Sequence, residues 1–332
     1  MQLKTDYGRR GDLVANLKTE KGKGLPDLNV NELSLWQRMK RDRFLFALLL
    51  PGLIYFAIFK YMPMWGTLMA FKDYSPFLGF WQSEWVGFEH FHNFFTNPDF
   101  FRLLRNTLIL ALYDIIFFFP APIILSLMIN EIRMTLYKRS IQTFVYVPHF
   151  MSWVIIASIS YVFLTTSGGA VNEIVSFFTG KEVSFLSSPD WFRPVIIGQV
   201  IWKETGWGTV IFLAALANVS HEQYEAAIVD GAGRFRRMWH VTLPALKSTI
   251  VILLILRLGN FLDQGFQQIY LMTNSLNREV ADVFDTYVYF MGITQGAFSY
   301  SAAVGLFKAI VGIILIYGAN YFAKKIGEEG LF

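Results

Sequence analysis

The chain has 332 residues, of which 54% are hydrophobic and only 16% are charged, whereas soluble domains carry about 25% charged residues. So few charges could not cover the surface of a soluble protein of this size, and an aromatic content of 17% excludes an intrinsically disordered chain. The composition indicates an integral membrane protein, and the lack of cysteine excludes disulfides, thiolate nucleophiles and cysteine-based metal sites.

The polar N-terminal segment, residues 1–43, precedes the first apolar stretch. Ser34 followed by Gln37 fits a capping box, which marks the start of a helix. Leu33 and Trp36 fall on one face of that helix. We therefore predict a helix that lies on the inner leaflet and leads into the membrane, with a solvated helix free of lipid contact as the alternative.

Six apolar stretches are each long enough to cross a bilayer, which takes about 20 helical residues. They are continuous and lack the alternation of barrel strands, so they predict an all-α integral membrane protein with six transmembrane helices. The predicted spans cover residues 44–71, 103–130, 141–165, 194–219, 243–268 and 300–323. They form one membrane domain over 44–325, followed by a short tail over 326–332. Gly198, Gly206 and Gly208 mark close packing or a kink in the fourth span.

Basic residues set the orientation of these helices. Outside the spans, lysine and arginine crowd residues 1–43, the loops 131–140 and 220–242, and the tail. The opposite loops hold four basic residues: Lys72, Lys181, Arg193 and Arg278. Because positive loops stay on the cytoplasmic side, we predict that both termini are cytoplasmic. The net charge of +4 then follows from membrane topology, and we expect no binding of nucleic acid.

The loop over residues 72–101 is rich in phenylalanine, tryptophan and tyrosine. Aromatic side chains sit at the level of lipid headgroups, and they also stack on sugar rings or dock a partner; both interpretations remain open. The same loop contains His90 and His92. No fixed carboxylate completes a metal site beside them, so we expect ordinary surface histidines and no metal centre.

The loop over residues 220–242 is longer than a connection between two spans requires. Ser220 is a suitable N-cap for a helix over 221–229, and Gly231 follows in a turn that ends it. A second amphipathic turn comes next, and Pro244 opens the following span. We predict a helix–turn–helix projection outside the membrane, which either rests on lipid or docks a cytoplasmic protein.

This projection also resembles a known family. Glu225-Ala226-Ala227, with Gly231 and then Leu243-Pro244 downstream, resembles the EAA loop of permease subunits in type I ATP-binding-cassette importers. Further upstream stretches resemble the carbohydrate-uptake permeases that handle oligosaccharides and polysaccharide fragments, including alginate or pectin fragments. These stretches are Phe59-Lys60-Tyr61-Met62-Pro63-Met64, Arg105-Asn106-Thr107, Asn130-Glu131-Ile132-Arg133 and Tyr146-Val147-Pro148-His149-Phe150-Met151-Ser152-Trp153-Val154.

The resemblance implies partners and a cellular location. It implies a bacterial cytoplasmic (inner) membrane, a second homologous permease in a heterodimer, two cytoplasmic ATPase subunits, an external solute-binding protein and a carbohydrate substrate. A coupling helix would bind a groove on the ATPase through Glu225, Ala226, Ala227, Asp230, Gly231, Ala232 and Pro244. The chain has no G-x-x-x-x-G-K-[ST] phosphate loop. We therefore expect a non-catalytic chain without a cofactor, with ATP and Mg²⁺ bound by the ATPase subunits.

Polar and charged side chains within the fourth and fifth spans suggest a translocation path. On a continuous fifth helix, the polar residues from Arg257 to Gln268 fall within an arc of about 100°. The predicted path residues are Trp202, Lys203, Glu204, Trp207, Arg257, Asn260, Gln264, Gln267 and Gln268. The alternative is a structural network in which Glu204 neutralises Arg257, or Lys203 neutralises Asp263.

The depth of Arg257 bears on the substrate. It lies about 20 Å along the helix from Pro244, where a guanidinium favours a carboxylate-bearing sugar through a bidentate contact. Acidic oligosaccharides such as uronates are therefore expected, with neutral oligosaccharides as the alternative. A secondary transporter should show two matching halves and would not need the loop 220–242. A membrane enzyme for lipid-linked sugars should show paired carboxylates or a metal cluster in a large loop.

Overall fold

The computed structural model describes residues 42–325, 327, 330 and 331. The interfacial helix predicted within residues 1–43 lies outside the described residues. The chain divides into two compact units, Met1–Trp65 and Gly66–Phe332. Both are helical wherever they are described, apart from turns and one short hairpin, in agreement with the predicted all-α class.

The described part of the first unit is a single helical stretch. It consists of α3 (Arg43–Phe56), the π-helical turn η1 (Ala57–Tyr61) and α4 (Met62–Met64). Pro51 lies inside α3, a position that membrane helices tolerate. Together with the 3₁₀ helix η2 (Trp65–Phe71), these elements give a continuous helix that is long and apolar enough to cross a membrane.

In the second unit, η2 is followed by an antiparallel hairpin, β1 (Lys72–Asp73) and β2 (Glu84–Trp85), in which Lys72 pairs with Trp85. Helices make up the rest of its regular structure. They are α5 (Gly79–Gln82), α6 (Glu89–Thr96), α7 (Phe100–Tyr113), η3 (Asp114–Phe118), α8 (Pro120–Asn130), α9 (Thr135–Tyr146), η4 (Val147–Phe150), α10 (Trp153–Leu164), α11 (Ala170–Thr179), α12 (Pro189–Leu216), α13 (His221–Val229), α14 (Arg234–Arg237), η5 (Met238–Thr242), α15 (Leu243–Ala245), α16 (Lys247–Gly259), α17 (Phe266–Met272), α18 (Arg278–Ala281), α19 (Phe284–Tyr289), η6 (Phe290–Thr294) and α20 (Phe298–Lys325).

Up to six membrane crossings can be built from these helices by length and composition. Three are unbroken: Arg43–Phe71, Phe100–Asn130 and Phe298–Lys325. Three more pass the same test as bent pairs: Thr135–Phe150 with Trp153–Leu164, Pro189–Leu216 with His221–Val229, and Arg234–Ala245 with Lys247–Gly259. The number agrees with the six predicted spans, so the chain is a multi-pass membrane protein. In the last two pairs, α13 and α14 lie beyond the predicted spans, in the predicted loop 220–242.

The predicted third span, residues 141–165, is bent by 101° between η4 and α10. Pro148 lies in η4, and its ring removes one backbone donor from the helix. Ser152 then caps α10, with its Oγ accepting the backbone N–H of Ile155 at 3.3 Å. The span predicted as one helix is therefore divided into two helices at this bend.

The predicted fifth span, residues 243–268, is not one helix either. α16 ends at Gly259, a turn follows, and α17 begins only at Phe266. Gly265 has a φ of 74°, in the left-handed region that costs other residues about 1–2 kcal/mol. Residues beyond this break therefore do not share a helix face with residues before it.

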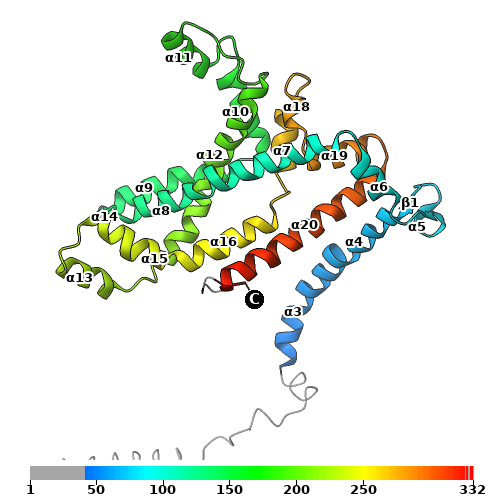
Figure 1. The fold of residues 1–332 in the computed structure, drawn as a ribbon. Coiled ribbons are helices and arrows are strands. Elements are labelled where there is room, and N and C mark those ends of the chain that lie inside the picture. Colours follow the sequence, from blue (N-terminus) through cyan, green and yellow to red (C-terminus); the bar gives the residue numbers. More distant parts are fainter. Residues whose placement is uncertain (1–41, 326, 328–329, 332) are drawn as a thin grey trace, which may run out of the picture. The chain divides into compact units, whose positions relative to one another are not determined.

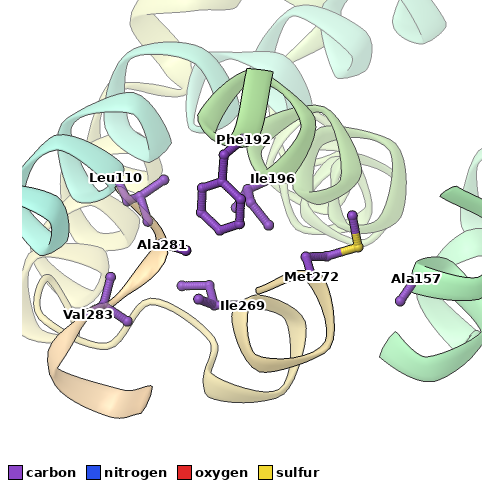
Figure 2. Close-up of a cluster of buried hydrophobic side chains, with 8 residues drawn as sticks. All are labelled: Leu110, Ala157, Phe192, Ile196, Ile269, Met272, Ala281 and Val283. Carbon is purple, nitrogen blue, oxygen red and sulfur yellow. The ribbon is translucent and has the colours of Figure 1, made fainter. Parts of the chain in front are cut away.

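The core of the second unit forms around α12. Figure 2 shows Phe192 and Ile196 of α12 meeting Ile269 and Met272 of α17, with Val283 on the far side of the cluster. Interlocked side chains of this kind gain dispersion contacts that a looser arrangement loses. α17 is thereby fixed on α12 after the break. Figure 1 shows α16 and α20 running side by side, and α13 with α14 and α15 at one end of this unit.

Glycines let α12 approach its neighbours closely. A Cβ at Gly206 would lie 1.9 Å from the Val145 carbonyl oxygen, and one at Gly208 would lie 2.8 Å from Pro122 Cβ. A Cβ at Gly198 would meet nothing within 4 Å. Close packing is thus confirmed for Gly206 and Gly208, whereas Gly198 faces open space.

We expect Gly206→Ala to lower the melting temperature of the detergent-purified protein and Gly198→Ala to maintain or raise it. Overpacking a close helix contact costs about 1–3 kcal/mol. Alanine on an open helix face is instead favoured over glycine by up to about 1 kcal/mol. Equal melting temperatures for the two variants would contradict the close approach of α12 to α9.

Candidate functional site

The projection between the fourth and fifth predicted spans has the predicted local structure. α13 covers His221–Val229, and Ser220 Oγ accepts the backbone N–H of Glu222 at 3.2 Å. Gly231 has a φ of 76°, which makes the turn after α13 possible. Both the helix bounds and its N-cap are therefore confirmed.

One hydrogen bond ties this projection to the base of the fifth span. The Tyr224 hydroxyl donates to Thr242 Oγ1 at 3.0 Å, and Thr242 is only 1% exposed. The bond joins α13 to η5 across 18 residues of chain. α13 and the start of the fifth span are therefore linked by a side chain as well as by the backbone.

Four of the seven predicted coupling residues line a hollow beside α13. A cavity of about 560 Å³ lies between α13 and α15, and Ala226, Ala227, Asp230 and Pro244 line it. Glu225 and Gly231 are exposed on the projection, and Ala232 is half-buried. Val229 and Phe235 are 86% and 84% exposed, so the projection presents bare apolar side chains next to charged ones.

We expect Tyr224→Phe to loosen the projection without unfolding the membrane helices. The change leaves Thr242 without its side-chain donor, and a lost hydrogen bond costs about 0.5–1.5 kcal/mol. Hydrogen exchange of the α13 amides should therefore become faster, by roughly threefold to tenfold for that energy. Tyr137→Phe, on an exposed tyrosine of α9, is the matched control. Unchanged exchange in both variants would contradict the linkage.

Three of the four predicted path residues of the fourth span contact His149. Lys203 is buried, and its Nζ donates to the His149 carbonyl oxygen at 2.5 Å and lies 3.3 Å from Glu204 Oε1. Glu204 Oε2 lies 2.7 Å from Nδ1 of His149, whose ring stacks on Trp207 at a centroid distance of 4.7 Å. Trp202 and Trp207 are about half exposed. The bend between η4 and α10 therefore carries a charged corner with aromatic faces beside it.

Arg257 of the fifth span forms a two-pronged ion pair with Asp114. Its Nε donates to Asp114 Oδ2 at 2.5 Å, and its Nη2 contacts Asp114 Oδ1. Asp114 is buried, whereas the guanidinium stays partly exposed. Asn260 and Gln264 lie beside the pair around a narrow cavity, so three predicted path residues come together here. The suggested pairing of Arg257 with Glu204 is wrong.

The ion pairs around the helix break also differ from those that the sequence suggested. Asp263 pairs with Lys308 and not with Lys203: Lys308 Nζ lies 2.5 Å from Asp263 Oδ1 and also contacts Asp285. Asp285 Oδ2 accepts the backbone N–H of Gln264 at 3.0 Å. Lys308 of α20 therefore ties the turn after α16 to α19.

The glutamines beyond the break lie on two faces of α17. Gln268 is buried, and its Nε2 donates to the Ile196 carbonyl and to Gln199 Oε1, both at 2.9 Å. Gln267 is exposed. Because α16 and α17 are separate helices, the expected continuous stripe through Arg257 is wrong. The stripe divides into an ion pair before the break, a buried amide contact after it, and one exposed glutamine.

The aromatic loop encloses a buried lysine. Lys72 Nζ donates to the Phe80 carbonyl at 2.6 Å and lies 4.7 Å and 5.3 Å from the ring centroids of Phe80 and Trp85. His90 Nε2 lies 3.0 Å from the Lys72 carbonyl oxygen. These contacts give part of the loop a structural role. Within the residues that the structure describes, no group of three or more His, Cys, Asp or Glu side chains could hold a metal ion.

Asp114, His149 and Tyr224 are among the residues whose partners differ from any that the sequence indicated. Asp114 carried a usable signal, because an ionisable residue within an apolar run normally pairs inside the bundle. His149 and Tyr224 carried no comparable signal. Their partners lie 55 and 18 residues away in the chain, and only the fold brings them together.

The crossings and the projection between two of them define a membrane permease subunit. Residues 118–328 match the family of binding-protein-dependent transport system inner membrane components, and the chain belongs to this family. It is 68% identical over 300 residues to the protein LplB of Bacillus subtilis (strain 168), a match that covers 90% of this chain and 94% of that protein.

Two further similarities concern proteins whose names state a substrate. The polygalacturonan/rhamnogalacturonan transport system permease protein YteP of Bacillus subtilis (strain 168) is 56% identical over 295 residues, covering 89% of this chain and 92% of that one. A bacterial alginate ABC transporter, solved in complex with an alginate pentasaccharide-bound periplasmic protein, contains a chain with a TM-score of 0.82 and 41% identity. That match covers 90% of this chain and 99% of the other.

Proposed function

We propose that this chain is one of two related permease subunits of an ATP-driven importer for acidic oligosaccharides. Uronate-bearing fragments of polysaccharides would pass from an external solute-binding protein into the bacterial cytoplasm by alternating access. The observation that carries the proposal is the likeness, at 56% and 41% identity over most of the chain, to permeases of polygalacturonan/rhamnogalacturonan and alginate transport systems. Polygalacturonan and alginate are both polymers of uronic acids.

The proposal assigns different tasks to different subunits. A separate pair of ATPase subunits binds ATP and Mg²⁺, and this chain needs no cofactor of its own. The projection over residues 220–242 docks the ATPase, and both termini lie on the same cytoplasmic side. The exposed Val229 and Phe235 support this docking, because bare apolar side chains beside charged ones are typical of a surface that a partner covers.

The translocation path would use two polar groups inside the membrane, the one around Glu204 and the ion pair between Arg257 and Asp114. Trp207 offers an apolar face to a sugar ring, while Glu204 beside it accepts hydrogen bonds from hydroxyls. Arg257 is already held by Asp114, so a substrate carboxylate reaches only the exposed side of its guanidinium. Arg257 would therefore contribute charge to the path without releasing Asp114.

Uptake by the reconstituted complex tests the proposed substrate. Proteoliposomes that contain the complex and internal ATP, with the solute-binding protein outside, should accumulate an oligogalacturonate. The fully methyl-esterified oligomer, which has the same length and no charge, is the matched control and should accumulate at least about tenfold more slowly. Equal accumulation of both oligomers would show that the carboxylates are not recognised, and accumulation of the ester alone would reverse the assignment to a neutral substrate.

A further inference from the structure

A further cavity, with both apolar and polar side chains in its lining, lies after the helix break. It has a volume of about 620 Å³ and lies between the segment 270–275 and the pair formed by α19 and η6. Tyr270, Arg278 and Tyr289 are among its lining residues. This volume falls within the range of about 300–1,000 Å³ that small-molecule sites occupy.

Aromatic rings form one wall of this cavity. Tyr270 is 51% exposed, and its ring centroid lies 5.3 Å from those of both Phe266 and Tyr289. The three rings brace one another, so the exposed face of Tyr270 is held in place. A fixed aromatic face with a hydroxyl at its edge matches a sugar, which has an apolar ring face and a polar rim.

An arginine forms the opposite, charged part of the cavity. Arg278 Nε donates to Asp282 Oδ2 at 3.1 Å, and its guanidinium carbon lies 5.3 Å from the Phe290 ring centroid. Its side chain is 52% exposed, and its two terminal nitrogens have no hydrogen-bond partner among the described residues. Asp282 also faces Arg102 at 3.5 Å. The cavity therefore has a positioned guanidinium whose outer edge can still donate to a carboxylate.

Buried hydrogen bonds and apolar contacts support the frame around the cavity. Asn277 is buried, and its Nδ2 donates to the carbonyls of Leu186 and Met272 at 3.1 and 3.0 Å. The packed cluster in Figure 2 fixes the elements on both sides, with Met272 on α17, and with Ala281 and Val283 flanking the buried Asp282. Because these groups are ordered before any ligand arrives, binding would cost little conformational entropy.

The cavity continues a surface that begins at a predicted path residue. Gln267 and Tyr270 are three residues apart on α17, so they share one face of that helix. Both are exposed, whereas Gln268 and Ile269 point into the core. A polar face therefore runs along α17 from Gln267 to the aromatic wall.

We propose that this cavity is a second sugar site, which binds one uronate unit of the oligosaccharide next to the membrane path. Tyr270 stacks on the pyranose ring, and the terminal nitrogens of Arg278 donate to its carboxylate. This inference rests on the proposed function, since it requires an acidic oligosaccharide as substrate. It assigns recognition of the acid group to Arg278, whereas Arg257 is already occupied by Asp114.

Cysteine protection in the assembled complex tests the site directly. The chain has no native cysteine, so Ser275→Cys places a single thiol in this chain at the cavity lining. With cysteine-free partner subunits, trigalacturonate should slow maleimide labelling of this thiol at least fivefold, and its methyl ester should slow it less than twofold. Adding Arg278→Gln should abolish the difference between the two sugars. Arg105→Gln, which changes an exposed arginine outside the cavity, is the matched control and should preserve it.

Uptake by the same complex separates the failure of this inference from failure of the proposed function. Arg278→Lys keeps the charge beside Asp282 but lacks the planar guanidinium that can make two parallel hydrogen bonds. It should therefore raise the KM for the acidic oligomer at least fivefold and leave kcat within twofold. If the unmodified complex imports the acid and trigalacturonate gives no protection, the second site is wrong and the proposed function stands. If the unmodified complex imports no acidic oligomer, the proposed function itself fails, and this site fails with it.

Discussion

Replacing Gly231 by valine is expected to reduce ATP-driven uptake by at least about tenfold while the membrane helices stay folded. Gly231 has a φ of 76°, and a β-branched residue in the left-handed region costs at least about 1–2 kcal/mol. The strain falls on the turn that orients α13 relative to α14. A displaced α13 would no longer match its partner, so ATP hydrolysis and uptake should become uncoupled.

Two matched variants make this expectation specific. Gly231→Asn should retain most of the uptake, because asparagine tolerates the left-handed region better than other residues. Gly233→Ala should also be close to neutral, since Gly233 has a φ of −65° and open space around it. Glu225→Lys should resemble Gly231→Val without altering the turn. Normal substrate-stimulated ATP hydrolysis and normal uptake in both Gly231→Val and Glu225→Lys would contradict the assigned role.

Breaking the ion pair between Asp114 and Arg257 should have the largest effect on folding. Removing one partner of a fully buried ion pair costs about 3–5 kcal/mol, and this pair, with its guanidinium side chain 43% exposed, should lie at or below the lower end of that range. Asp114→Asn should therefore yield little folded protein in detergent extracts. Arg257→Lys, made on its own, should give an intermediate yield of folded protein, because an ammonium group cannot reproduce the two-pronged contact that Asp114 accepts. Size-exclusion profiles of the extracted protein measure both.

A double variant separates folding from transport at this position. Asp114→Leu combined with Arg257→Met removes both charges, and neutral replacement of a buried pair is often tolerated. Folded protein should therefore reappear in the double variant. Uptake should stay low if the exposed side of Arg257 serves the path. Full uptake in the double variant would limit Arg257 to a structural role.

The sequence predicted the fold well where local signals agree. Continuous apolar runs gave the number of crossings, and Ser220 with Gly231 gave the bounds of α13. These predictions depend on capping and on helix length, which are properties of neighbouring residues. Such predictions therefore need no knowledge of the tertiary structure.

The candidate site was predicted less well, because it depends on breaks and on distant partners. Gly259 and Gly265 bracket the break in the fifth span, but an apolar run with two glycines also fits a continuous membrane helix. Asp114 and Arg257 are 143 residues apart in the chain. Several ionisable residues within the spans were possible partners for Arg257, and no periodicity selects among them.

The most direct test of ATP-driven import measures what drives uptake in a single preparation. Proteoliposomes containing the complete complex are loaded with ATP or with a non-hydrolysable analogue, and an ionophore removes every ion gradient. With the solute-binding protein and an oligogalacturonate outside, the complex should accumulate the oligomer against a gradient with ATP and should not accumulate it with the analogue. Accumulation that is independent of ATP and is abolished by the ionophore would contradict ATP-driven import, because the chain would then work as a secondary transporter.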